Sequence, residues 1–267
     1  MSSVNRLLCW SLIISGFISL NALGKDKIPH QRGIELRGGY SMYLDMTDPN
    51  QFNKDFTGTT GYSQKEYSES AGTLGGGISL LYKTADYFCW HIGLNVLATD
   101  SATATAVNAL NETQVSKIYV NATEIFLTVN YYLNVTPRFN LQIGAGPAFY
   151  LASMDKSIPS VAESVYGTAF YDAHGRSFGF LGTAGLEFFL SNAISLKFGG
   201  GFRWAPISRF KYFVEYSSPT GNYKEGEIAY WHNSWDTFEA DFSGGFAEIG
   251  LRVYFEPATQ WKKYDAE

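Results

Sequence analysis

A histidine and a serine two residues apart are the side chains best suited to covalent chemistry in this chain. His232 and Ser234 lie in the segment 231–235, Trp-His-Asn-Ser-Trp, and the carboxylate of Glu239 follows. A base beside a hydroxyl, with a carboxylate to orient the base, activates a serine for acyl transfer. The same spacing also arises often by chance in a loop rich in polar and aromatic residues. We keep these three residues as candidates and expect no enzymatic activity.

A second group of candidate residues consists of charged and titratable side chains at alternate positions of extended segments. The group comprises Glu35, Arg37, His91, Glu124, Glu187, Lys197, Arg203, Glu248 and Arg252. Four carboxylates and four permanent cations belong to it, and an unpaired buried charge costs several kcal/mol. If these side chains share one interior, they form either a salt-bridged plug or a path for protons or ions. We favour the plug, because an eight-stranded barrel is just wide enough for side chains to fill it.

The segments that carry these residues alternate apolar and polar side chains. They are eight in number and lie at 33–44, 72–83, 87–99, 118–133, 138–151, 178–190, 194–206 and 242–255. Three connections between them are short, at 84–86, 134–137 and 191–193. The other four are long, at 45–71, 100–117, 152–177 and 207–241. Short turns at one end and long loops at the other are typical of a barrel in an outer membrane.

The alternation predicts strands with one apolar wall and one polar wall. In the first strand Ile34, Leu36 and Tyr40 share one face, and Glu35 and Arg37 share the other. A soluble barrel would turn its apolar face inward. Strand length, small residues on the polar face and aromatic residues at strand ends favour a membrane instead. The small residues include Gly75, Gly77, Gly199 and Gly201, and the aromatic residues are Tyr82, Tyr87, Tyr131, Phe139, Phe149, Phe178, Phe188 and Trp204.

The sequence predicts an all-β fold, an up-and-down antiparallel transmembrane β-barrel of eight strands. Two further alternating runs surround Pro-Thr-Gly-Asn at 219–222 and predict a hairpin. This hairpin leaves a ten-stranded barrel as the alternative. The long loops hold tyrosine among small polar residues, a composition that suits adaptable binding surfaces.

The first 24 residues have the features of a secretory signal peptide. Arg6 precedes an apolar run from Leu7 to Leu20, and Ala22 and Gly24 supply the small residues before a cleavage site. We expect residues 1–24 to be removed, residues 25–255 to form the barrel and residues 256–267 to form a short periplasmic tail. Both ends of the barrel domain are then periplasmic.

Composition argues against several other classes of protein and site. The net charge of −5 lacks the basic excess that nucleic-acid binding requires. The mature chain would hold one cysteine, Cys89, and therefore no internal disulfide. No second histidine or cysteine shares the face of His91, and the sequence has no glycine-rich phosphate loop. We expect no metal and no cofactor.

The last strand carries a family resemblance. Residues 244–255, Gly-Gly-Phe-Ala-Glu-Ile-Gly-Leu-Arg-Val-Tyr-Phe, resemble the closing strand of small eight-stranded outer-membrane barrels of the OmpA/OmpX type. Such proteins commonly end in an aromatic residue that the barrel assembly machinery reads, whereas here twelve residues follow Phe255. The resemblance implies the bacterial outer membrane as the location. Its lipids, lipopolysaccharide and the barrel assembly machinery are the implied partners of a monomer.

The expected function is structural or surface-binding, through long extracellular loops that contact a protein or small molecule. One alternative is a narrow porin or transporter of small solutes. A less favoured alternative is an esterase that modifies lipid A, because outer-membrane lipid A deacylases are small barrels with a His-x-Ser spacing similar to that of His232 and Ser234. Their residues lie on the barrel wall, whereas these two lie in an expected loop.

Overall fold

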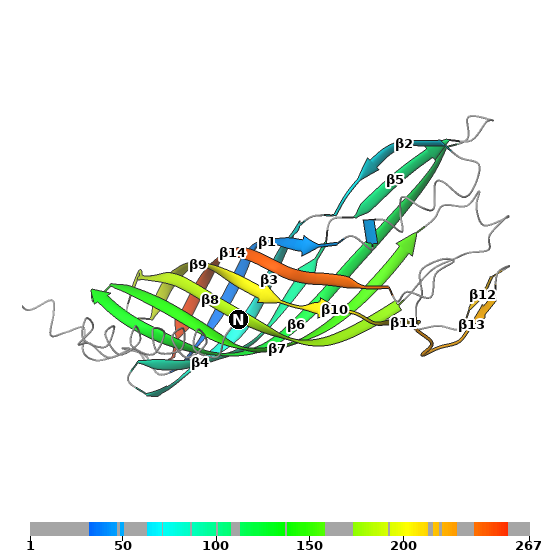
Figure 1. Ribbon diagram of the computed structural model, residues 1–267. Helices are drawn as coiled ribbons and strands as arrows, with labels where there is room; N and C mark the ends of the chain where they lie inside the picture. Colours follow the sequence, from blue (N-terminus) through cyan, green and yellow to red (C-terminus); the bar gives the residue numbers. More distant parts are fainter. Residues whose placement is uncertain are drawn as a thin grey trace, which may run out of the picture.

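A computed structural model gives the fold, and eight long antiparallel strands form its wall (Figure 1). The structure describes residues 32–46, 49–50, 63–70, 72–85, 87–99, 101–107, 113–136, 138–157, 173–191, 193–212, 216–218, 221–228 and 238–255. The expected signal peptide at 1–24 and tail at 256–267 lie outside these residues. The wall strands are β1 (Arg32–Asp45), β3 (Gly72–Ala85), β4 (Phe88–Ala98), β6 (Thr113–Thr136), β7 (Phe139–Ser157), β8 (Ala173–Phe189), β9 (Ile194–Trp204) and β14 (Ala240–Tyr254).

The wall closes between its first and last strands. β1 pairs with β14 from Gly33↔Tyr254 to Tyr43↔Gly244, and on its other side it pairs with β3. Each remaining wall strand pairs with its neighbours along the chain, all antiparallel. The predicted up-and-down barrel of eight strands is confirmed. Closure leaves no free edge in the wall, which is the condition for β structure in lipid.

The hairpin that suggested ten strands lies apart from the wall. β12 (Tyr216–Ser218) and β13 (Gly221–Tyr223) pair only with each other and form a separate two-stranded sheet. Two short strands before them extend the wall instead: β10 (Pro206–Ile207) pairs with β14, and β11 (Phe210–Tyr212) pairs with β8.

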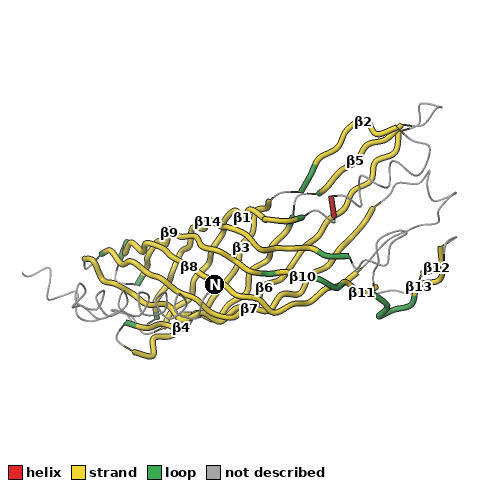
Figure 2. Tube along the Cα trace, viewed as in Figure 1, coloured by secondary structure: helices red, strands yellow, loops and turns green. Residues whose placement is uncertain are grey.

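Strand pairing continues into two segments, 45–71 and 100–117, that the sequence predicts to be loops. β2 (Ser63–Ser68) pairs with β5 (Ala102–Val107), and β5 pairs with the first residues of β6. The three strands project beyond one rim of the barrel (Figure 2). The sequence of β5, Ala-Thr-Ala-Thr-Ala-Val, alternates, and its β-branched residues fit an extended backbone.

The two rims of the barrel differ. The short connections around 86–87, 137–138 and 190–193 lie at one rim, hereafter the turn end. The described ends of the barrel meet there too, since the Phe255 amide donates to the Arg32 carbonyl at 3.0 Å. The opposite rim, the loop end, carries β2, β5, β10 and β11.

The outer face of the wall is apolar. Leu36, Met42 and Phe178 are 55%, 63% and 76% exposed, and every wall strand has exposed apolar residues at outward positions. Most of the expected interfacial aromatic residues lie on this face. Tyr131 is instead buried, because the rings of Tyr87 and Phe88 pack against it. Among the described residues no helix is long and apolar enough to cross a bilayer.

Candidate functional site: the lumen of the barrel

The charged residues singled out in the sequence all belong to inward positions of the wall. Side chains alternate across a strand, so each polar face turns to the lumen when the apolar face turns outward. Seven of these side chains are nearly inaccessible: Glu35, Glu124, Glu187, His91, Lys197, Arg203 and Arg252 have exposures of 0–3%. The side chains of Arg37 and Glu248 are 4% and 8% exposed. The lumen therefore gathers four carboxylates and four permanent cations away from water.

Arg252 on β14 is the centre of the cluster nearest the turn end. Its Nε lies 2.5 Å from Glu35 Oε2, and Glu35 is its direct partner in the β1–β14 register. Its Nη1 lies 3.0 Å from the Tyr132 hydroxyl and 3.3 Å from Glu187 Oε1, and its Nη2 donates to Gln142 Oε1 at 2.9 Å. The guanidinium thus joins five strands.

Glu187 on β8 and His91 on β4 complete this cluster. Glu187 accepts hydrogen bonds from the hydroxyls of Ser195 (2.6 Å) and Tyr254, and from the Asn140 amide at 3.4 Å. His91 Nε2 lies 3.0 Å from the Tyr132 hydroxyl. No group of three or more His, Cys, Asp or Glu side chains suited to a metal occurs within the described ranges.

The middle of the lumen is crossed by Lys197 and Arg37. Lys197 Nζ lies 2.5 Å from Glu248 Oε1 and 3.5 Å from Glu35 Oε1. Arg37 approaches Glu248 at 3.5 Å, and its guanidinium carbon lies 4.4 Å from the centre of the Phe126 ring. The negative face of the Phe126 ring stabilises the part of the Arg37 charge that the carboxylates do not neutralise.

Toward the loop end a separate ion pair spans the barrel. Arg203 Nε on β9 lies 2.5 Å from Glu124 Oε2 on β6, although the two strands are not neighbours in the wall. Asn95 donates to the other oxygen of Glu124 at 2.7 Å, and Arg203 Nη1 donates to the Ser41 hydroxyl at 3.2 Å.

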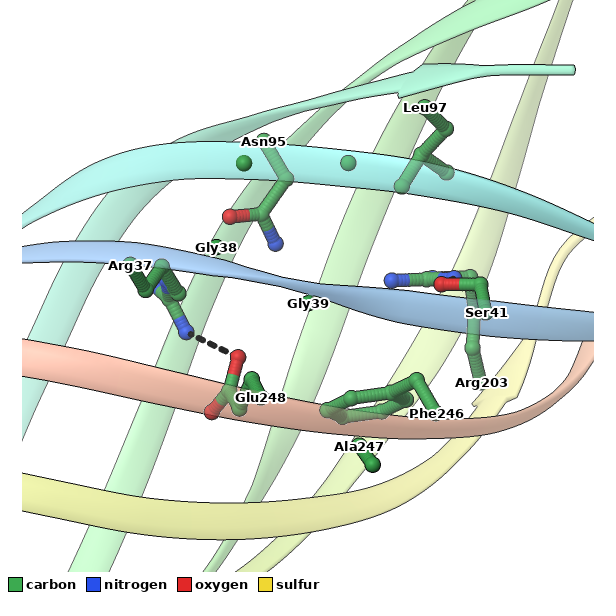
Figure 3. A pocket seen from close by; sticks show the side chains of 12 residues that line it. Arg37, Gly38, Gly39, Ser41, Asn95, Leu97, Arg203, Phe246, Ala247 and Glu248 are labelled. Carbon is green, nitrogen blue, oxygen red and sulfur yellow. Dashed lines mark hydrogen bonds and ion pairs between the residues drawn. The ribbon is translucent and has the colours of Figure 1, made fainter.

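A cavity of about 30 Å³ separates this pair from the middle of the lumen (Figure 3). Arg37, Asn95, Ser41, Arg203 and Glu248 line it, together with glycines of β1 and β3. Arg37 Nε and Nη2 and Asn95 Oδ1 make no hydrogen bond within the protein. A polar space of this size has room for about two waters.

The loop end of the lumen is apolar, which the sequence reading missed. Phe210, Phe242, Ile207 and Phe238 are 0–2% exposed, and the Phe210 and Phe238 rings meet edge to face at 5.3 Å. A smaller apolar group closes the turn end, where Phe189 stacks on Tyr254 at 5.8 Å. The ion pairs are therefore sandwiched between two apolar layers.

A sequence signal for the apolar layer exists in β6. From Glu124 toward the turn end, the inward residues are mostly polar and the outward residues Ile125 and Leu127 are apolar. Before Glu124 the pattern inverts: Ile118 and Val120 face inward and are buried, while Lys117 faces outward. The polar face of β6 therefore turns to the lumen only between Glu124 and the turn end.

The uncharged lumen residues were also missed as members of the site. Tyr132, Gln142, Tyr254 and Ser195 lie at inward positions, but nothing in a single strand indicates that they bind Arg252 or Glu187. Those contacts cross the lumen, so they depend on the closure and shear of the whole barrel.

The candidate nucleophile and base lie outside the described part of the chain. His232 and Ser234 fall in 229–237, whereas Glu239 is described and lies exposed immediately before β14. The proposed trio therefore remains a prediction.

Comparison with known proteins gives structural neighbours. No family model and no curated protein matches the sequence. Among solved structures, the chain is similar to the outer membrane protein OprG from Pseudomonas aeruginosa (13% identity, covering 88% of this chain and 99% of that chain, TM-score 0.46). It is also similar to Neisserial surface protein A (11%, 84% and 97%, TM-score 0.46) and to outer membrane protein W from E. coli (13%, 85% and 100%, TM-score 0.33).

The geometry of the chain itself indicates that the barrel lies in a membrane. An apolar outer face surrounds a charged lumen, and the wall is closed. These are the properties of a β-barrel of the outer-membrane type.

Proposed function

We propose that this protein is a non-conducting outer-membrane barrel whose loop end is a binding surface outside the cell. The observation that carries the proposal is the filled lumen, where buried ion pairs lie between two apolar layers. The barrel wall then serves as a scaffold, and function belongs to the elements beyond the loop-end rim. It is no enzyme in this proposal.

The contacts inside the barrel support a closed lumen. An ion that crosses it must displace Arg252 from Glu35 and Glu187, and Lys197 from Glu248, leaving charges unpaired in a space with little water. Breaking one buried pair costs about 3–5 kcal/mol. It must also pass the layer around Phe210 and Phe242, in which the buried residues are aliphatic and aromatic.

The elements at the loop end support a binding role. β2, β5 and the start of β6 form a sheet that stands beyond the rim, and β12 with β13 forms a separate hairpin at the same end of the barrel (Figure 1). The backbone of Tyr216 pairs with that of Tyr223 in the hairpin register. Tyrosine supplies large, rigid contact area with a polar tip, which suits recognition of a protein or small molecule.

Planar-bilayer recording of the purified full chain tests the proposal. We expect no stable conductance from the natural sequence, because the buried ion pairs occupy the lumen of the described barrel. The matched variant is Arg203→Ala with Phe242→Ala, which removes a guanidinium and a loop-end ring together. If the natural protein itself conducts steadily at low voltage, the narrow-transporter alternative replaces the plugged scaffold.

A further inference from the structure

Three cations gather on the outer face of the barrel at the loop end of β8 and β11. Lys211 on β11 lies directly opposite His174 on β8, and Arg176 follows two residues along the same face of β8. Arg209 lies in the two-residue link before β11, and all four side chains are exposed. Directly opposed side chains are about 5 Å apart and diagonal ones about 7–8 Å, so Arg176 and Lys211 reach a common ligand.

The cluster lies where the wall leaves the membrane. Along β8 the outward residues Phe188, Phe180 and Phe178 are exposed and apolar, and Arg176 is the next outward residue. Phe178 is 76% exposed and its ring lies 4.9 Å from that of Phe149 on β7. Aromatic residues mark the interface of a bilayer, so Arg176 lies at the level of the lipid headgroups.

The backbone brings the cations together at this level. A Cβ at Gly175 would lie 2.5 Å from Ile207 Cγ2 and 3.3 Å from the Arg209 carbonyl oxygen, so the link carrying Arg209 packs closely against β8 only because residue 175 is glycine. On β6 the outward residues just beyond the apolar face are Thr123 and Asn121, which carry no charge. At this level β6 therefore has no counterpart of the cation cluster.

Among the described residues, Glu239 lies beside the link that carries Arg209, because Ile207 pairs with Ala240, and two further acidic side chains occur near the cluster. Asp155 is exposed on β7, one residue past the last β7–β8 pair, Met154↔Ala173. Glu227 lies next to Tyr212, and its carboxylate accepts a hydrogen bond from the Lys224 amide at 3.1 Å. Neither lies between Arg176 and the aromatic residues below it.

We propose that Arg176, Lys211 and Arg209 bind the phosphates of lipid A, the doubly phosphorylated glycolipid of the outer leaflet. This inference rests on the proposed function, which places the loop end outside the cell. Arginine binds phosphate in a bidentate manner and lysine adds a point charge, so three cations match two phosphates better than the single phosphate of a glycerophospholipid. The exposed ring of Phe178 and the half-buried ring of Phe149 then contact the acyl chains.

Native mass spectrometry of the full-length barrel in detergent tests this surface. The probe is doubly phosphorylated, six-chain lipid A, compared with its dephosphorylated form and with phosphatidylglycerol. The variant is Arg176→Gln with Lys211→Gln. The control, Lys117→Gln with Arg138→Gln, removes the same charge from exposed positions away from the cluster, on β6 and in the turn before β7. We expect the natural protein and the control to retain lipid A, and the variant to bind it roughly 30-fold more weakly.

Three outcomes overturn the inference: equal retention by the variant, equal loss in the control, or equal retention of phosphatidylglycerol or dephosphorylated lipid A by the natural protein. Heat-dependent migration in gels shows that each variant is folded. A negative result in this lipid-binding test does not decide the proposed function. That function is tested separately, by the conductance of the natural sequence in bilayers without lipid A.

Discussion

Arg252 shows how individual residues hold this lumen together. Its guanidinium meets Glu35, Glu187, Tyr132 and Gln142, which come from four other strands. Each contact supports the others, because a carboxylate in a space with little water needs both a cation and hydrogen-bond donors. The fold depends on this residue more than on any exposed ion pair.

Replacing Arg252 with methionine should destabilise the barrel by about 3–5 kcal/mol, since Glu35 and Glu187 would lose their shared cation while they stay buried. Equilibrium urea unfolding in lipid vesicles, followed by tryptophan fluorescence, measures the free energy. Arg138→Met, in an exposed turn, is the control and should change it by less than about 0.5 kcal/mol. An equal, small effect of both changes would indicate a lumen that water enters freely.

Two adjacent glycines of β1 should respond in opposite ways to a methyl group. A Cβ at Gly39 would lie 2.2 Å from the Ala247 carbonyl oxygen, whereas at Gly38 the nearest atom would be 3.8 Å away. We expect Gly39→Ala to cost about 1–3 kcal/mol of unfolding free energy and Gly38→Ala to be nearly neutral. The same urea titration measures both, and a larger loss at Gly38 would contradict the register of β1 and β14.

At the residue level the sequence predicts which side of the wall a side chain faces, but not which residue it contacts. Alternation alone places Glu35, Arg37, Glu248 and Arg252 on inward positions of the first and last strands. It cannot pair Arg203 with Glu124, because β9 and β6 meet only across the lumen. That contact depends on how far the strands are staggered when the wall closes, and no local pattern encodes the stagger.

Among the elements, β6, β7 and β8 are the most informative because their alternation changes phase. Inside the membrane the apolar residues face outward, and beyond it they face inward, as Val120 on β6 and Met154 on β7 do. A strand that leaves lipid for water must exchange its two faces, since burial of apolar surface then requires the interior. This inversion is readable in the sequence, and it would have predicted both the apolar layer and the long strands that extend past the rim.

The hairpin of β12 and β13 should be dispensable for folding. At its base the Tyr212 amide donates to the Glu227 carbonyl and the Gly226 amide donates to the Tyr212 carbonyl, so removal of 215–223 leaves a short loop across the same gap. We expect this variant to keep heat-modifiable migration in gels, because the closed ladder of the wall is intact. Removal of 208–228 is the contrast: it takes away Phe210 and Tyr212, which are buried in the apolar layer, and should destabilise the barrel. Loss of folding in the shorter deletion would mean that the hairpin belongs to the wall.

The molecule as a whole is asymmetric along the barrel axis. The turn end has short connections and the meeting of Arg32 with Phe255, and the loop end has every additional strand. Outer-membrane barrels carry short turns on the periplasmic side and long loops outside. The proposed binding surface and the cation cluster both require this orientation.

Labelling of single cysteines in intact cells measures the orientation directly. Cys89 is buried, and replacing it with alanine gives a background into which Ser68→Cys at the loop end or Arg138→Cys at the turn end is introduced; both positions are exposed. We expect a membrane-impermeant maleimide to label the cysteine at 68 in intact cells and the one at 138 only after lysis. Detergent-solubilised protein, in which both should react, controls for access. Labelling at 138 with protection at 68 would place the loop end in the periplasm, and the surface-binding role would fail with it.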